Sequence, residues 1–132
     1  MKAELEITTH KRNEIIDITK NVGCLAKKSK TKEGLCIIYC PHTTAAITIN
    51  ENAGVENDLL KALGKLIQEH CGYEHDKIDN NAAAHIKSSL MGNSKVVPVE
   101  SGELQLGEWQ HIFFCEFDGP RKRKIHIKII GD

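Results

Sequence analysis

Residues 109–130 read WQHIFFCEFDGPRKRKIHIKII, and this stretch decides the fold class. Residues 109–117 are mostly apolar and aromatic, whereas isoleucines alternate with polar residues over 124–130. Alternation with period two is typical of a strand that buries one face, and Asp118-Gly119-Pro120 is typical of a tight turn. We therefore predict two long antiparallel strands that lie side by side at the C-terminal end of the chain.

The rest of the chain shows strand and helix periodicities in short segments. Strands are expected around residues 5–7 and 16–18, and at 35–40, 45–49, 96–99 and 104–106. Helices are expected at about 18–26, 54–70 and 81–91, with Gly72 as a terminator of the second. Short connections between neighbouring strands favour antiparallel pairing. No repeat or linker divides the sequence, so we predict one α+β domain over residues 1–132.

The composition disfavours several classes of partner. Lysine plus arginine and aspartate plus glutamate are equal at 18 each, so no overall field attracts nucleic acid or a membrane surface. The charged segment 1–6 lacks the apolar run of a signal peptide, and no apolar stretch approaches the ~18 residues of a membrane span. Five cysteines without a close CxxC pair suit a reducing cytosol. We therefore expect a cytoplasmic protein that binds no membrane and, at zero net charge, associates with itself.

His42 stands at a strand end, after Pro41 and before Thr43 and Thr44. Proline stops the preceding apolar run, so the imidazole can leave the core. A neutral imidazole binds metals or accepts a proton near neutral pH. The competing interpretation is a histidine that only forms a hydrogen bond with a neighbouring group.

A dense group of polar residues occupies positions 73–85. It contains His75 and His85 together with three acids. His85 lies one turn into an alanine-rich helix, where Ser88 and Ser89 share its face at i+3 and i+4. The HExxH spacing of many zinc sites is absent, so the residues support either a metal site or a polar surface loop.

Other polar residues interrupt or end apolar strands. Asn50 and Glu51 follow a strand, where they either cap the next helix or belong to a site. Glu116 falls on the apolar face of its strand, where a carboxylate is costly unless it is paired. It is either the buried partner of Arg121 or Arg123, or a carboxylate that orients a histidine. The two arginines are either solvated turn charges or a phosphate clamp.

Several of these stretches together resemble a known family. They are His42–Ala46, Thr48–Asn52, Asp79–Gly92 and Leu106–Arg123. The family is that of the secondary thiamine-phosphate synthases. This resemblance implies an antiparallel β-sandwich with two or three packed helices, assembled as a homotrimer. It also implies a metal bound through His42 and His85, with His75 as a third ligand. The activity it implies joins a pyrimidine-methyl diphosphate to a thiazole phosphate and releases pyrophosphate.

The leading hypothesis is a metal-dependent enzyme that acts on small phosphorylated substrates, with weak thiamine-phosphate synthase activity. In this hypothesis a divalent metal ion, zinc or magnesium, neutralises a diphosphate leaving group. His42, His75 and His85 would bind the metal. Arg121 and Arg123 would hold phosphate. The residues expected to act on substrate or to position it are Asn50, Glu51, Ser88, Ser89 and Glu116.

The alternative hypothesis is a non-catalytic homotrimer that binds a metabolite or a metal. Nucleic-acid binding is disfavoured, because no aromatic stacking motif lies beside the basic run at 121–124 and the chain has no net positive charge. His42 and His85 are far apart in the sequence, so only the tertiary structure can bring them together. We predict that they approach each other and share a ligand, with a divalent metal as the first candidate.

Overall fold

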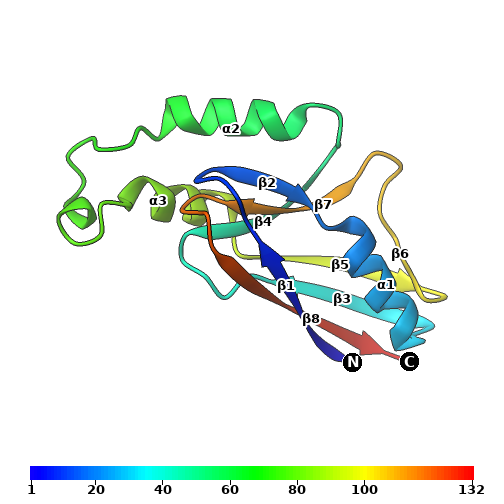
Figure 1. The fold of residues 1–132 in the computed structure, drawn as a ribbon. Helices are drawn as coiled ribbons and strands as arrows, with labels where there is room; N and C mark the ends of the chain where they lie inside the picture. Colours follow the sequence, from blue (N-terminus) through cyan, green and yellow to red (C-terminus); the bar gives the residue numbers. More distant parts are fainter.

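Eight antiparallel strands form two sheets in the computed structural model, which describes residues 1–132 (Figure 1). The larger sheet has the order β1 (Lys2–Thr8), β8 (Lys122–Gly131), β3 (Glu33–Tyr39), β5 (Ser94–Glu100) and β6 (Glu103–Leu104). The smaller sheet has the order β2 (Glu14–Asp17), β7 (His111–Glu116) and β4 (Ala45–Asn50). Every neighbouring pair is antiparallel. The predicted α+β class and antiparallel sandwich are confirmed.

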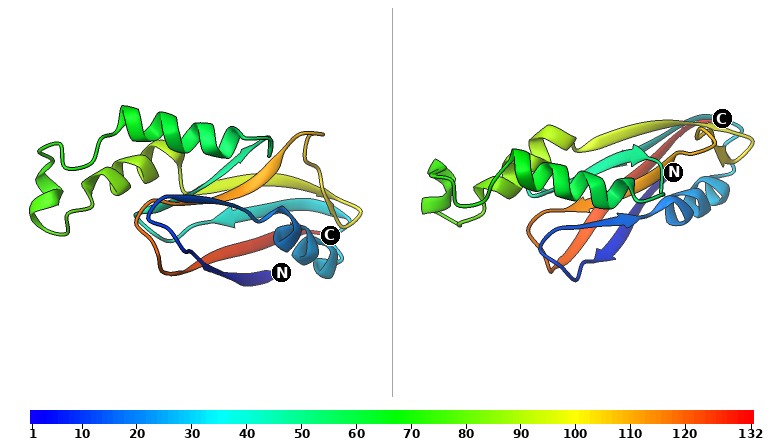
Figure 2. Two further views of the ribbon diagram at one scale, coloured as in Figure 1. Left: turned by 45° about the horizontal axis from the view of Figure 1, so that its top comes forward. Right: turned by 90° about the horizontal axis from the view of Figure 1, so that it is seen from above.

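Three α-helices occupy segments where helical periodicity is expected. They are α1 (Thr19–Ser29), α2 (Val55–Leu66) and α3 (Ala82–Met91), with one 3₁₀ turn, η1 (Glu74–Lys77), between the last two. α2 ends before the expected Gly72, because Ile67 has an extended backbone and is buried in the same cluster as Phe117. The segment around η1 projects beyond the ends of the strands (Figure 2). None of the helices combines the length and the apolar character needed to cross a bilayer.

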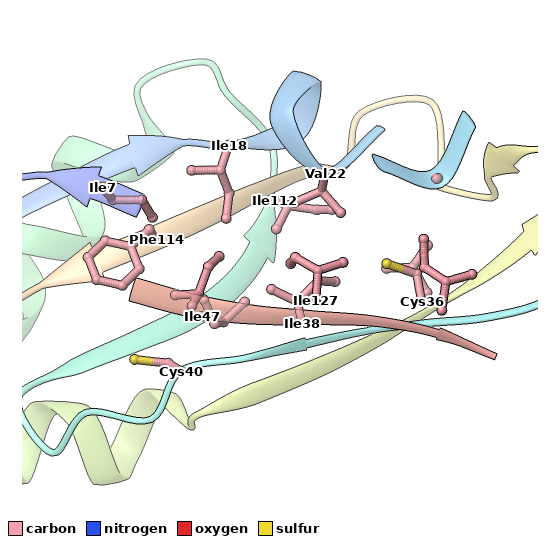
Figure 3. Close-up of a cluster of buried hydrophobic side chains, with 14 of the residues drawn as sticks. Ile7, Ile18, Val22, Cys36, Ile38, Cys40, Ile47, Ile112, Phe114 and Ile127 are labelled. Atoms are coloured by element: carbon pink, nitrogen blue, oxygen red, sulfur yellow. The ribbon is translucent and has the colours of Figure 1, made fainter. Parts of the chain in front are cut away.

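The main core lies between the two sheets (Figure 3). Ile38 and Ile127 of the larger sheet meet Ile47, Ile112 and Phe114 of the smaller one, and all five are completely buried. β3 and β8 alternate between buried and more exposed side chains, as period two predicts. β7 differs, because its second face packs under residues of α2 and α3. A strand buried on both faces reads as a continuous apolar run, which explains the sequence of β7.

β7 and β8 do not pair, so the prediction of neighbouring C-terminal strands is wrong. They belong to different sheets, and the connection between them carries the chain from one sheet to the other. Both edges of each strand are already occupied: β2 and β4 flank β7, whereas β1 and β3 flank β8. The connection packs against the β1–β2 loop, where the Gly119 amide donates to the Arg12 carbonyl oxygen at 3.1 Å.

Gly119 occupies a position with no room for a side chain. A Cβ there would clash with the carbonyl oxygen of Lys11 and lie 2.9 Å from Glu116 Cγ and from Thr9 Oγ1. We expect Gly119→Ala to lower the free energy of unfolding by about 1–3 kcal/mol, as at other overpacked sites. The control is Gly64→Ala in α2, where a Cβ meets nothing within 4 Å and alanine favours the helix. Urea denaturation measures both variants, and an unchanged midpoint for Gly119→Ala would contradict the crowding.

Candidate ligand-binding site

A polar cavity of about 660 Å³ opens at one end of the sandwich. It lies between the β3–β4 connection, the start of α3 and the β7–β8 connection. Its ten lining residues are polar except for one proline: Pro41, His42, Thr43, Thr44, Asp79, Asn81, His85, Asp118, Arg121 and Arg123. The volume is ordinary for a small-molecule site, but such sites are usually lined by apolar side chains. A ligand that fits this cavity is therefore polar over most of its surface.

A second cavity, of about 420 Å³, adjoins the first. Its lining residues are His42, Thr43, His85, Ser88, Ser89, Gly92 and Asn93. His42, Thr43 and His85 line both cavities. The tertiary structure thus brings His42 and His85, from the β3–β4 connection and from α3, to one place. That the two rings share a ligand stays a prediction.

The side chain of His42 is anchored on the backbone of β8. Its Nε2 lies 2.9 Å from the carbonyl oxygen of Lys124 and 3.2 Å from the amide nitrogen of the same residue. Burial lowers the pKa of His42 below 6.5, and the positive charge of Arg123 lowers it further. The ring is therefore neutral at neutral pH, and Nδ1 is the ring nitrogen left for a ligand.

His85 packs edge-on against His75, with ring centroids 4.5 Å apart and an interplanar angle of 77°. Nε2 of His75 is buried without a hydrogen-bond partner and lies 3.6 Å from Oδ2 of Asp79. His75 itself lines neither cavity. No three side chains of histidine, cysteine, aspartate or glutamate are grouped closely enough to hold a metal ion. The residues present do not fit a preformed metal site, so the divalent ion, zinc or magnesium, stays an untested prediction.

Glu116 and Arg123 form an ion pair inside the fold. Glu116 is completely buried, and Arg123 is 3% exposed. One carboxylate oxygen accepts from Arg123 Nε at 2.9 Å and from Thr9 Oγ1 at 2.8 Å, and the other accepts from Arg123 Nη2 and from the Asp118 amide. Burial by itself would raise the pKa of Glu116, but these hydrogen bonds outweigh it and hold the pKa below 4.5. Of the interpretations open for Glu116, the buried salt bridge is the one in the structure, and the pair supports the cavity wall.

Arg121 is the cation that remains available to a ligand. Its Nε donates to the carbonyl oxygen of Asp118 at 2.8 Å, and its Nη2 donates to the carboxylate of the same residue at 3.0 Å. About half of the Arg121 side chain stays exposed, and it lines the larger cavity. Asp118 also accepts from Asn81 Nδ2 at 2.8 Å and lies 3.5 Å from Arg12 Nη1. Asp118, which the sequence presents only as a turn residue, thus fixes the Arg121 guanidinium and ties α3 to the β7–β8 connection.

Asn50 and Glu51 line neither cavity. β4 begins near the larger cavity with Ala45 and ends with Asn50, opposite the first residue of β7. The first and last residues of β4 are five steps of about 3.3 Å apart, so the ends of the strand are separated by roughly 17 Å. Ser88 lies at the smaller cavity but is buried, and its Oγ donates to the Ala45 carbonyl oxygen at 2.6 Å. Ser89, which is exposed, is therefore the serine whose hydroxyl can meet a ligand.

A second polar cluster, not anticipated from the sequence, surrounds Asp17 at the far end of β4. Its carboxylate accepts from His111 Nδ1 at 2.7 Å, from Asn52 Nδ2 at 2.7 Å and from Thr19 Oγ1 at 2.6 Å. Burial by itself would raise the pKa of Asp17, but these donors hold the pKa below 3.8. The cluster joins β2, α1, β7 and the β4–α2 connection. We interpret it as a clamp that holds these elements together.

Comparison with known proteins places the chain among relatives of similar length. The family model described as "UPF0047 protein YjbQ-like" matches residues 3–132. A UPF0047 protein of Archaeoglobus fulgidus is 50% identical over 96% of this chain and 99% of the relative. The UPF0047 protein YugU of Bacillus subtilis is 48% identical over 99% of this chain and all of the relative. A YbjQ-like protein of unknown function from Sulfolobus solfataricus has a crystal structure with a TM-score of 0.97 and 36% identity, covering all of this chain and 97% of that one.

These findings correct two predictions made from the sequence. The assignment to the secondary thiamine-phosphate synthases is wrong, because the matching family and the two sequence relatives above carry the UPF0047 name, and the Sulfolobus protein is described as YbjQ-like and of unknown function. The prediction of a metal-dependent enzyme or transferase acting on phosphorylated substrates is wrong as well. The chain matches only a family of unknown function, and none of the matches above indicates such an enzyme. The chain belongs to the UPF0047 family of YjbQ-like proteins.

Proposed function

We propose that this protein binds a small phosphorylated molecule in the larger cavity. The observation that carries the proposal is Arg121, whose guanidinium Asp118 fixes on one side and whose other side is open to a cavity of polar residues. A guanidinium held in one orientation recognises phosphate oxygens at a reduced entropic cost. The exposed Thr43 hydroxyl and Nδ1 of the neutral His42 ring add uncharged hydrogen-bonding groups beside it.

The local charge balance supports an anionic ligand. Asp118 contributes a negative charge to the cavity, but Arg121 and Arg12 lie 3.0 Å and 3.5 Å from its carboxylate oxygens and offset it. The charge of Arg123 is compensated by Glu116 in the same way. Asp79 also lines the cavity, and its carboxylate lies 3.6 Å from Nε2 of His75. The phosphate is therefore expected at the Arg121 side of the cavity, where the Asp118 carboxylate is already paired.

Arg121→Gln is expected to weaken the binding of inorganic phosphate or pyrophosphate by about tenfold to a hundredfold, which corresponds to one charge-assisted contact of about 1.5–3 kcal/mol. Isothermal titration calorimetry measures the affinity. The matched control is Lys61→Gln, which removes the same charge from an exposed side chain of α2 outside both cavities. Titrations in chelator, in Mg²⁺ and in Zn²⁺ test the divalent ion separately. Equal affinity of both variants and the unchanged protein would refute the assignment of Arg121.

We also propose that the protein associates with itself as a homotrimer through the outer face of the larger sheet. Four large apolar side chains are 42–56% exposed there: Leu35, Tyr39, Val96 and Ile130. In the strand register, Leu35 lies opposite Ile130 in β8 and Pro98 in β5, so these side chains form one continuous surface. β3 is thus apolar on both faces, which is typical of a strand covered on both sides.

Charge complementarity supports a second copy of this chain as the partner. Glu33, Glu100 and Glu103 lie side by side across β3, β5 and β6, and all three are exposed. Like charges placed opposite each other in a sheet are destabilising. Lys124 and Lys128 are exposed on β8 of the same face, so a second copy can offer lysines to the three glutamates. Zero net charge leaves little repulsion between copies.

Val96→Lys is expected to convert the assembly into single chains, because it places a charge in the centre of the apolar surface. Sedimentation equilibrium should give three times 14.7 kDa for the unchanged protein and 14.7 kDa for the variant. Leu66→Lys is the control, since Leu66 is 72% exposed on α2, away from this face. An unchanged protein of 14.7 kDa at micromolar concentration would refute self-association.

We place the protein in the cytoplasm. All five cysteines are unpaired, and the thiols of Cys24 and Cys71 are exposed. Exposed thiols of this kind persist in a reducing compartment, whereas secreted small domains usually pair them.

A further inference from the structure

The two cavities differ in chemistry. The larger one is lined by four charged side chains, those of Arg121, Arg123, Asp79 and Asp118. The smaller one contains no aspartate, glutamate, lysine or arginine; beyond the shared residues it is lined by Ser88, Ser89, Gly92 and Asn93. One side of the site therefore suits an ionic group, and the other suits uncharged donors and acceptors.

The two cavities are joined at the histidines. His42 and His85 line both, so a ligand that fills both must pass these two rings. Nε2 of His42 is hydrogen-bonded to the backbone of Lys124. Nδ1 is therefore the nitrogen that can contact the part of the ligand lying between the two cavities. Together the cavities are large enough for a phosphate and a group of comparable size.

No aliphatic or aromatic side chain of a hydrophobic residue other than Pro41 lines either cavity. Pro41 is the one apolar residue in the larger cavity, and the smaller cavity has none apart from Gly92. Burying an apolar ring there would gain little, while the polar side chains around it would lose hydrogen bonds to water. The exposed side chains of Ser89 and Asn93 instead can donate to, and accept from, hydroxyl groups.

We infer that the ligand is the phosphate ester of a polyhydroxylated compound, such as a sugar or polyol phosphate, with its phosphate at Arg121 and its hydroxyl groups at Ser89 and Asn93. This inference rests on the proposed phosphate site and adds the class of molecule attached to the phosphate. Thr43, exposed and common to both cavities, lies where the ester linkage passes from one to the other.

The test compares three probes by calorimetry: inorganic phosphate, ribose 5-phosphate and phenyl phosphate. Ribose 5-phosphate is expected to bind at least about tenfold more tightly than the other two, the gain from one or two additional hydrogen bonds. The double variant Ser89→Ala/Asn93→Ala should bind ribose 5-phosphate no better than inorganic phosphate, with its affinity for inorganic phosphate unchanged. The matched control, Ser94→Ala/Asn57→Ala, alters exposed residues outside both cavities and should leave all three affinities unchanged.

A second measurement avoids dependence on the folding of the double variant. In amide spectra of the unchanged protein, ribose 5-phosphate should shift the signals of Gly92 and Asn93, and inorganic phosphate should not. If phosphate binds but phenyl phosphate binds as tightly as ribose 5-phosphate, the polyol inference is overturned and the phosphate site stands. If none of the three probes binds, both proposals are overturned.

Discussion

Arg123→Met is expected to lower the free energy of unfolding by about 3–5 kcal/mol, because it leaves the carboxylate of Glu116 buried without its counter-charge. Glu116 is completely buried and receives two of its four hydrogen bonds from Arg123. Thr9 and the Asp118 amide remain, but neither carries a charge. Urea denaturation at neutral pH measures the loss.

The pH dependence of the free energy of unfolding should show whether Arg123→Met is destabilised by the unpaired charge or by poor packing. In the unchanged protein the pKa of Glu116 is held below 4.5, so its stabilising contribution is present above pH 4.5 and is lost as the pH falls below that value. Without Arg123, burial becomes the dominant influence and raises the pKa of Glu116. The variant should therefore gain stability as the pH is lowered from neutral towards 5, whereas the unchanged protein should not. A loss that is independent of pH would show that packing, not charge, is responsible.

Two controls complete the experiment. Lys61→Met, an exposed residue of α2, should change the free energy of unfolding by less than about 0.5 kcal/mol. The double variant Glu116→Gln/Arg123→Met should recover part of the loss, since it removes both charges from the interior.

The ion pair between Glu116 and Arg123 could be predicted from the sequence. Arg123 has the same parity along its strand as Ile125 and Ile127, and both isoleucines are completely buried. Glu116 has the same parity as Ile112 and Phe114. Two charges on two apolar faces predict a partnership. Alternation does not distinguish Arg123 from Arg121, which has the same parity; Arg121 is exposed because it lies before β8 begins at Lys122. The separation of Asn50 and Glu51 from His42 also follows from strand length: His42 precedes β4, Asn50 ends it, and Glu51 follows it.

Other features could not be derived from local patterns. Helices and alternating strands follow from side chains a few residues apart, which is why α1, α2 and α3 fall where periodicity expects them. Membership of a sheet depends instead on which edges are occupied, and β7 finds its partners in β2 and β4, from the first half of the chain. The role of Asp118 depends likewise on Asn81 and Arg12, which approach it only in the folded chain.

Phe117→Ala is expected to lower the free energy of unfolding by about 3–5 kcal/mol and to loosen α3 in particular. Phe117 is completely buried in a cluster with Leu63 and Ile67 from the α2 segment and with Ala83 and Ala84 of α3. The alanines are too small to collapse into the space that a phenyl ring leaves, so the cavity would persist beneath the helix that carries the site histidine His85. Urea denaturation measures the global loss.

Hydrogen exchange of the α3 amides measures the local effect, and Phe113→Ala is its matched control. Phe113 is also buried, and its replacement by alanine removes the same ring from β7. It lies towards the far end of the strand, opposite Asp17 in the register of β2. Both variants should lose comparable global stability, while only Phe117→Ala should accelerate exchange in α3 beyond that shared loss. If α3 exchanges equally fast in both variants, Phe117 stabilises the fold as a whole and does not specifically anchor the helix that forms the wall of the site.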